Sequence, residues 1–453
     1  MAYTSTSGKL PNETASKLGH LNVIKSDWIK TLINDFEYVD NEHTSDPCKT
    51  QWEIFNKSAE PLTNIWAVDG SYVKVLSGNH PKKEIAFVKT ALLMIDKLKI
   101  DKVDKYNPHP LHMKNIMDNS ALFHATVFPL SNVRTSKGSN YDAVRNIIFE
   151  SIQIDENGAY YETLKWLTYK KWSREKHNSL SFFCPHCFKE VEGGFPYDSD
   201  KMACPHNDCK KEILLTDMLG FHLDMIEDSA PDSVASAYML ILETLMIFTP
   251  IRLFWDYVDK RLVTNTLFIK DGPLSLSSQY SKLIPNIREF LEYAKVQGRP
   301  IHIIGCEKSG KFFDHLISIE QFAPLKNKGD NICFSVLSHK YIVDEIQRRP
   351  PSTNQYGSRT NWGEKIYVKL EPGTCMVLNI PTGLYNRSDD FPKKDDIIGL
   401  DRILSTIPSL ISRKYEGALF PIELANGIAS MSSYPSAKIL ERYVDNTINK
   451  SKK

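Results

Sequence analysis

The stretch WAVDGSYVKV, Trp66 to Val75, places an Asp-Gly pair between two apolar, β-prone segments. Asp-Gly is the strongest short signal for a hairpin turn, because glycine adopts a positive φ without steric cost. An aspartate at the end of an apolar strand is also a candidate for chemistry. We expect the chain to leave the strand sharply at Gly70, so that Asp69 serves both the turn and a functional site.

A second copy of this arrangement occurs in LFIKDGPL, where Asp271 ends an apolar strand and is followed by Gly272 and Pro273. The segment after it leads toward a helix and does not return as a paired strand. This context weakens the interpretation of Asp271 as a hairpin residue. A functional carboxylate is the stronger hypothesis here.

A third unusual carboxylate is Glu243, within YMLILETLMIF, Tyr238 to Phe248. The flanking residues are apolar on every helical face, which is typical of a buried helix. A buried carboxylate must be neutralised, paired or bound to a metal. The simpler alternative is an ion pair with Arg252 or another arginine.

Two strand-end aspartates and a buried glutamate are the donor set that Mg²⁺ or Mn²⁺ prefers, since hard cations bind oxygen ligands. Asp69, Glu243 and Asp271 are therefore our candidate ligands of a catalytic Mn²⁺ or Mg²⁺. A metal held in this way activates water and stabilises charge on a phosphodiester. The sequence thus predicts phosphodiester hydrolysis.

The cysteines predict a separate metal site. Four of the eight lie close together as C-x2-C and C-x4-C with sixteen residues between, and they are Cys184, Cys187, Cys204 and Cys209. Two such knuckles supply the tetrahedral thiolate set of a structural Zn²⁺. His186 and His206 lie inside the knuckles and could replace a cysteine, but four thiols already close the site. Clustered cysteines also favour a reducing cytoplasm over a disulfide framework.

The composition is that of an ordinary globular protein, with 453 residues, 42% hydrophobic and 25% charged. Because 56 Lys and Arg balance 55 Asp and Glu, any binding of a polyanion must be local. The polar N-terminal sequence does not resemble a signal peptide. The apolar run Ala235 to Trp255 is interrupted by charged residues and Pro250, so we expect a buried helix, no membrane span and a cytoplasmic location.

Strands dominate the first half of the chain after residue 62, and strands alternate with helices in the second half. This order predicts an α/β fold with a mixed sheet flanked by helices, plus a small four-cysteine zinc-ribbon insert. The segment IIGCEKSGKFF nearly matches a phosphate-binding loop, but Phe312 stands where Ser or Thr would bind Mg²⁺. An ATPase is therefore disfavoured. Lys308 in this segment remains a candidate contact for a DNA phosphate.

These motifs resemble the NurA nuclease family. WAVDGS, the helical Glu243, LFIKDGPL and IHIIGCEKS follow its order and approximate spacing over Leu62 to Ser433, with Glu243 placed 28 residues before Asp271. The resemblance implies an RNase H-like core, a homodimer, Mn²⁺- or Mg²⁺-dependent DNA cleavage and a HerA-like hexameric ATPase as partner. It also implies that Asp69, Glu243 and Asp271 bind the metal, with Lys308 near the substrate phosphate.

The sequence pattern and this resemblance together predict a division of the chain. The expected parts are a helical lead-in (1–61), the first part of the nuclease core (62–181), the zinc ribbon (182–215), the second part of the core (216–435), and a C-terminal helix with a basic tail (436–453).

The chain departs from the family where a Tyr-Pro stretch normally ends in Ala-His. In ALFPIELAN, Ala418 replaces the tyrosine and Asn426 the histidine, and Tyr415 is a substitute candidate. Our first hypothesis is a metal-dependent DNA nuclease in DNA-end processing or anti-phage defence. The alternative is a catalytically weak zinc-ribbon adaptor that binds DNA or an ATPase. The motifs do not distinguish DNA from RNA.

Overall fold

The computed structural model describes most of the chain, namely residues 25–35, 51–56, 59–78, 81–96, 121–133, 135–136, 138–227, 229–257, 259–324, 332–348, 356–370, 373–412, 418–431 and 435–450. The chain divides into two units, 1–47 and 48–453. The first unit contains α2 (Asp27–Asn34), which lies within the expected helical lead-in. The second unit contains everything that follows.

Nine strands of the described residues form one mixed sheet, in the order β1-β11-β12-β13-β10-β9-β2-β3-β4. Its strands are β1 (Glu53–Ile54), β2 (Asn64–Ser77), β3 (Lys83–Asp96), β4 (Ala121–Ser131), β9 (Thr266–Asp271), β10 (His302–Glu307), β11 (Ile332–Val336), β12 (Glu364–Leu370) and β13 (Thr374–Ile380). Because β1 pairs with β11, the segment ahead of residue 62 contributes to this sheet.

Five of these strands form the centre of the fold. β2, β3 and β4 are consecutive antiparallel neighbours, whereas β9 runs parallel to β2, and β10 runs parallel to β9. Across the sheet these strands follow one another as β4, β3, β2, β9 and β10. Numbered one to five in chain order, this is the order 3-2-1-4-5, which is the RNase H-like arrangement. The expected α/β fold with a mixed sheet is confirmed.

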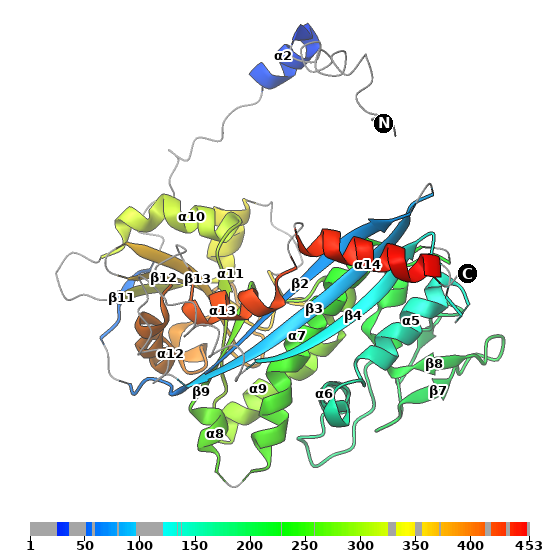
Figure 1. The fold of residues 1–453 in the computed structure, drawn as a ribbon. Coiled ribbons are helices and arrows are strands. Elements are labelled where there is room, and N and C mark those ends of the chain that lie inside the picture. The colour runs from blue at the N-terminus through cyan, green and yellow to red at the C-terminus, as the bar shows by residue number, and fades with distance from the viewer. Residues whose placement is uncertain are drawn as a thin grey trace. The chain divides into compact units, whose positions relative to one another are not determined.

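Helices cover both faces of this sheet. The helices are α5 (Asn140–Ser151), α6 (Ala159–Thr168), α7 (Asp232–Trp255), α8 (Arg261–Thr264), α9 (Ile284–Val296), α10 (Lys311–Ile319), α11 (His339–Tyr341), α12 (Leu400–Thr406), α13 (Phe420–Ala429) and α14 (Ser436–Lys450). Shorter helical segments are η2 (Glu156–Gly158), η3 (Leu215–Leu219), η4 (Phe221–Asp224), η5 (Ser278–Leu283), η6 (Glu320–Phe322), η7 (Ile342–Gln347), η8 (Lys394–Asp396) and η9 (Ile407–Leu410). α5, α6, α7 and α9 share one apolar core, and α12 and α13 share another. Figure 1 shows α13 and α14 in front of β2 and β3, with α7 behind them.

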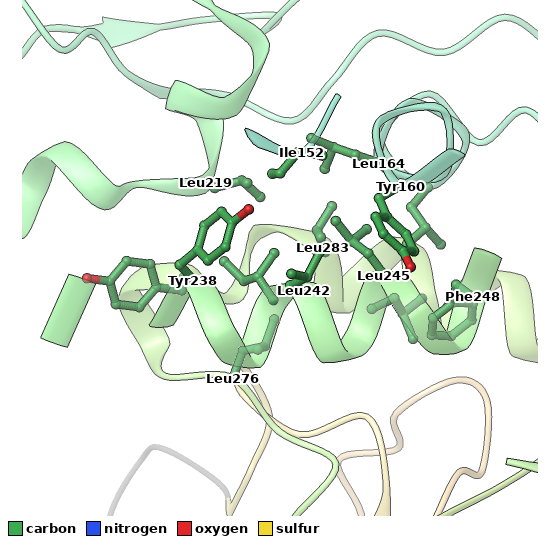
Figure 2. Close-up of a cluster of buried hydrophobic side chains, with 14 of the residues drawn as sticks. Ile152, Tyr160, Leu164, Leu219, Tyr238, Leu242, Leu245, Phe248, Leu276 and Leu283 are labelled. Carbon is green, nitrogen blue, oxygen red and sulfur yellow. The ribbon is translucent and has the colours of Figure 1, made fainter. Parts of the chain in front are cut away.

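Helix α7 is the centre of the first core. Figure 2 shows Tyr238, Leu242, Leu245 and Phe248 of this helix among side chains from the surrounding elements. Its length and composition would suit a membrane span, but 83% of its most apolar window is buried within the fold. The sequence interpretation as a buried core helix agrees with this packing.

The structure corrects the interpretation of the opening Asp-Gly pair. β2 does not end at Asp69, because Asp69 pairs with Ala91 and Gly70 with Thr90 in an unbroken ladder that reaches Ser77. The local turn signal is overridden by fourteen residues of pairing with β3. Asp271, in contrast, is the last residue of β9, and Gly272 follows it with a φ of 83°.

The glycine-lysine segment after Ile303 is not a phosphate-binding loop. Gly305 lies inside β10 and pairs with Lys270 on one side and Asn379 on the other. Only residues 308–310 separate the end of β10 from the start of α10. The short connection agrees with the sequence argument against an ATPase.

Candidate active site and metal centre

Asp69 and Asp271 are brought together by the pairing of β2 with β9. The parallel ladder runs from Asn64 opposite Thr266 to Val68 opposite Lys270, so the two aspartates are the next residues in register. Side chains alternate between faces along a strand, which places both aspartates on the face of Ala67. That face is covered by the core of α12 and α13.

Lys308, which directly follows β10, reaches the same position. Cys306 pairs with Asp271, and Lys308 follows two residues later on the same face. Its Nζ lies 2.8 Å from Oδ2 of Asp271, and the two side chains are 28% and 23% exposed. This ion pair is therefore within reach of a ligand from solvent.

Glu243 approaches from the opposite face, on α7. Its Oε2 lies 2.6 Å from Nζ of Lys270, and the side chains of Glu243 and Lys270 are only 3% and 1% exposed. Nζ of Lys270 also donates a hydrogen bond of 3.0 Å to the carbonyl of Asp271. The buried ion pair therefore joins the middle of α7 to the end of β9.

The ion pair that was the alternative for Glu243 is present, but its partner is a lysine and not an arginine. Arg252 instead donates to Oγ1 of Thr163 at 3.0 Å and to the carbonyl of Ala159 at 3.2 Å. The sequence analysis missed Lys270, although a lysine inside the apolar strand LFIKD was a usable signal. A lysine in such a strand must pair with a buried acid or reach solvent.

Gly70 makes room for Glu243. A Cβ atom at this position would lie 2.6 Å from Cγ of Met239 and 2.7 Å from Oε1 of Glu243. The φ of Gly70 lies outside the left-handed region, so the residue is needed for space and not for a turn. The glycine of the Asp-Gly pair thus lets α7 approach the strand that carries Asp69.

The carboxyl groups strongly influence one another. Burial raises the pKa of Asp69 to about 7, and the nearby charges of Asp271 and Glu243 add to the effect. The Gly70 N–H, which donates to Oδ1 of Asp69 at 2.8 Å, and the Lys308 ammonium act in the opposite direction. Burial also raises the pKa of Glu243, against the attraction of Lys270. Such a group of oxygen donors suits a divalent cation.

The three carboxylates do not yet form a closed cage. Across the described part of the chain, only the four cysteines bring three or more ligand atoms within 4.8 Å of one another. Asp69 and Asp271 share one face, whereas Glu243 is held by Lys270 on the other. The donor chemistry fits Mn²⁺ or Mg²⁺, with the two aspartates as the ligands best placed to share an ion.

The cysteine group, in contrast, has the spacing of a metal site. Sγ of Cys184 lies 4.0 Å from that of Cys209, and Sγ of Cys187 lies 3.8 Å from that of Cys204. Zinc–sulfur bonds of about 2.3 Å in a tetrahedron imply sulfur separations of about 3.8 Å. The four thiols could therefore bind a metal such as zinc without rearrangement.

Two small hairpins present these cysteines, β5 (Phe182–Phe183) with β6 (Glu190–Val191), and β7 (Lys201–Ala203) with β8 (Glu212–Leu214). The knuckle histidines have a different use. Nε2 of His186 bonds to the carbonyl of Glu212 at 2.9 Å, and Nε2 of His206 bonds to that of Glu190 at 3.1 Å. Each histidine therefore ties its own hairpin to the other, and the four cysteines remain the ligand set.

The insert is built into the main core. Cys184, Cys204 and Val191 belong to the same apolar cluster as α7. Asp217, just after the insert, accepts two hydrogen bonds of 2.8 Å from the guanidinium of Arg145, and this ion pair is buried. The ribbon therefore has the contacts of a structural element.

The two departures from the family pattern lie near α13. Ala418 is buried, and Asn426 is exposed on the helix. Tyr415, the substitute candidate, falls outside the described residues.

Neither a family model nor a curated protein matches this chain. Among solved structures, it is similar to one described as "Crystal structure of NurA", with 10% sequence identity and a TM-score of 0.31 over 97% of this chain and 98% of that chain. A similarity at this level supports no conclusion about activity. The fold class stands on the strand order, and the function has to be argued from the site.

Proposed function

We propose that this protein is a divalent-metal-dependent nuclease that hydrolyses phosphodiester bonds in DNA. The observation that carries the proposal is the register of two adjacent parallel strands, which sets Asp69 within β2 beside Asp271 at the end of β9. Both carboxylates lie on one face, and the buried Asp69 is close enough to Asp271 and Glu243 for their charges to raise its pKa. A divalent cation relieves this repulsion.

Each residue has a role in this proposal. Asp69 and Asp271 would hold Mn²⁺ or Mg²⁺, and Glu243, paired with Lys270 on the other face, adds a nearby negative charge. Bound there, such a cation supplies a Lewis acid and lowers the pKa of a water nucleophile. Lys308, whose ammonium contacts Asp271 from a partly exposed position, binds and orients the scissile phosphate.

The wider context of the activity rests on the motif order alone. WAVDGS, Glu243, LFIKDGPL and IHIIGCEKS support a homodimer that works with a HerA-like hexameric ATPase in DNA-end processing or anti-phage defence. In this setting Zn²⁺ in the Cys184 group has a structural role, because four thiols leave no position for a reacting water.

A nuclease assay tests the proposal. The chain is purified alone and with a candidate ATPase, and linear and circular DNA are incubated with Mn²⁺ or Mg²⁺. Asp69→Asn abolishes cleavage and leaves the circular dichroism spectrum unchanged, whereas the exposed control Asp256→Asn cleaves like the parent. Full activity in Asp69→Asn would exclude the mechanism. RNA substrates in parallel identify the sugar preference.

The second candidate function is an adaptor without turnover. The observation in its favour is that Lys270 and Lys308 already pair with two of the three carboxylates. Calorimetry with the zinc site filled separates the two functions. Heat of Mn²⁺ binding that disappears in Asp69→Asn supports the nuclease, and its absence in the parent protein supports the adaptor.

A further inference from the structure

The pairing of Lys270 with Glu243 bears on how many metal ions the site can hold. Nζ of Lys270 is fixed at two points, 2.6 Å from Oε2 of Glu243 and 3.0 Å from the carbonyl of Asp271. A divalent ion that bound Glu243 would have to displace a buried ammonium. Breaking a buried ion pair in this way leaves one charge unpaired and is strongly unfavourable.

We propose that Lys270 takes the place of a second divalent cation, so that the site binds one metal ion per chain, held by Asp69 and Asp271. This inference rests on the proposed function and specifies its metal stoichiometry. Two-metal sites hold their ions about 3.5–4 Å apart and need carboxylates that serve both. Glu243, the third carboxylate, is committed to Lys270 on the other face of the sheet.

The charges around the site agree with a single ion. Three carboxylates and two lysines of the described residues act on one another at this site: Asp69, Glu243 and Asp271, with Lys270 and Lys308. One negative charge is therefore uncompensated. A single divalent ion turns it into one positive charge, which attracts a phosphodiester, whereas two ions would leave a large positive excess.

Counting bound Mn²⁺ by electron paramagnetic resonance tests the inference without any activity measurement. The zinc content of the same samples is measured separately. The parent protein binds one Mn²⁺ per chain, and Asp69→Asn binds none. Lys270→Met frees Glu243 and binds a second Mn²⁺.

A double variant keeps the test decisive if Lys270→Met does not fold. Lys270→Met/Glu243→Gln replaces the buried ion pair by uncharged side chains of similar size, a change that proteins often tolerate. It retains one Mn²⁺ per chain, because Glu243 is not a ligand of that ion. Loss of Mn²⁺ in the double variant overturns the inference.

The failure of this inference differs from a failure of the proposed function. Two Mn²⁺ ions in the parent protein overturn the one-ion site, a single ion in a folded Lys270→Met overturns the role of Lys270 in place of a second cation, and both results leave the nuclease proposal intact. Absence of Mn²⁺ from the parent protein overturns both.

Discussion

Substitution of Gly70 by alanine tests how closely α7 approaches the strand that carries Asp69. The added methyl group would lie 2.6 Å from Cγ of Met239 and 2.7 Å from Oε1 of Glu243. Both separations are below 3.0 Å, which is closer than a Cβ atom comes to other heavy atoms in proteins. Met239 is half-buried and can turn away, but Glu243 is held by Lys270.

The expected cost follows from this difference. Insertion of a methyl group into a packed core costs about 1–3 kcal/mol, because side chains leave their preferred rotamers or the backbone shifts. We therefore expect Gly70→Ala to lower the free energy of unfolding by about 1–3 kcal/mol. In a Met239→Ala protein the clash with Met239 is absent and only the clash with Glu243 remains. We therefore expect Gly70→Ala to lower the free energy of unfolding less in the Met239→Ala protein than in the parent protein.

Urea denaturation of the four proteins of this cycle measures the effect, with Mn²⁺ omitted. A change below about 0.5 kcal/mol, the usual range for substitutions at the surface, would show that α7 is free to move away from β2. Complete recovery in the double variant would place the whole clash on Met239. Glu243 would then have room to move, and the argument that Lys270 fixes it would fail.

Two further predictions concern the metals and pH. Cys204→Ser loses zinc and several kcal/mol of stability, since zinc binding contributes about 10–16 kcal/mol in zinc-finger peptides. Cys375→Ser is the control, because Sγ of Cys375 donates to Glu320 at 3.1 Å and a serine hydroxyl can donate in the same way. A zinc-free variant of unchanged stability would contradict the structural role of the ribbon. Burial raises the pKa of Asp69 in the folded protein to about 7, from an ordinary value of 3.8. Between these two pH values the folded protein keeps a proton on Asp69 that the unfolded chain has lost, so the free energy of unfolding falls as pH rises from about 4 to about 7. Asp69→Asn removes this fall in unfolding experiments without Mn²⁺, and an unchanged pH profile would show that Asp69 does not cause it.

The sequence shows the four-cysteine cluster and Glu243 clearly because both signals are local. Two short cysteine spacings define one, and a charged residue in an all-apolar helix defines the other. The same dependence on local signals places Asp69 at a turn. Asp-Gly is a local turn signal, whereas the pairing with β3 that overrides it involves residues distant in sequence. β11 (Ile332–Val336) was not anticipated, because a short apolar run can belong to a strand or a buried helix. Lys270 could be suspected of pairing, but its partner is set by packing between α7 and β9.

The division of the site into two faces follows from the register of two strands. β2 and β9 run parallel, so the carboxyl end of β9 lies beside the middle of β2, and the apolar residues Ala67 and Ile269 face the α13 core on one side. A slip of one residue would turn each side chain of β9 to the opposite face. Asp271 would then lie beside Glu243, and Lys270 beside Asp69. The same buried side chains that hold β9 in register therefore keep the lysine with the glutamate and leave the two aspartates together.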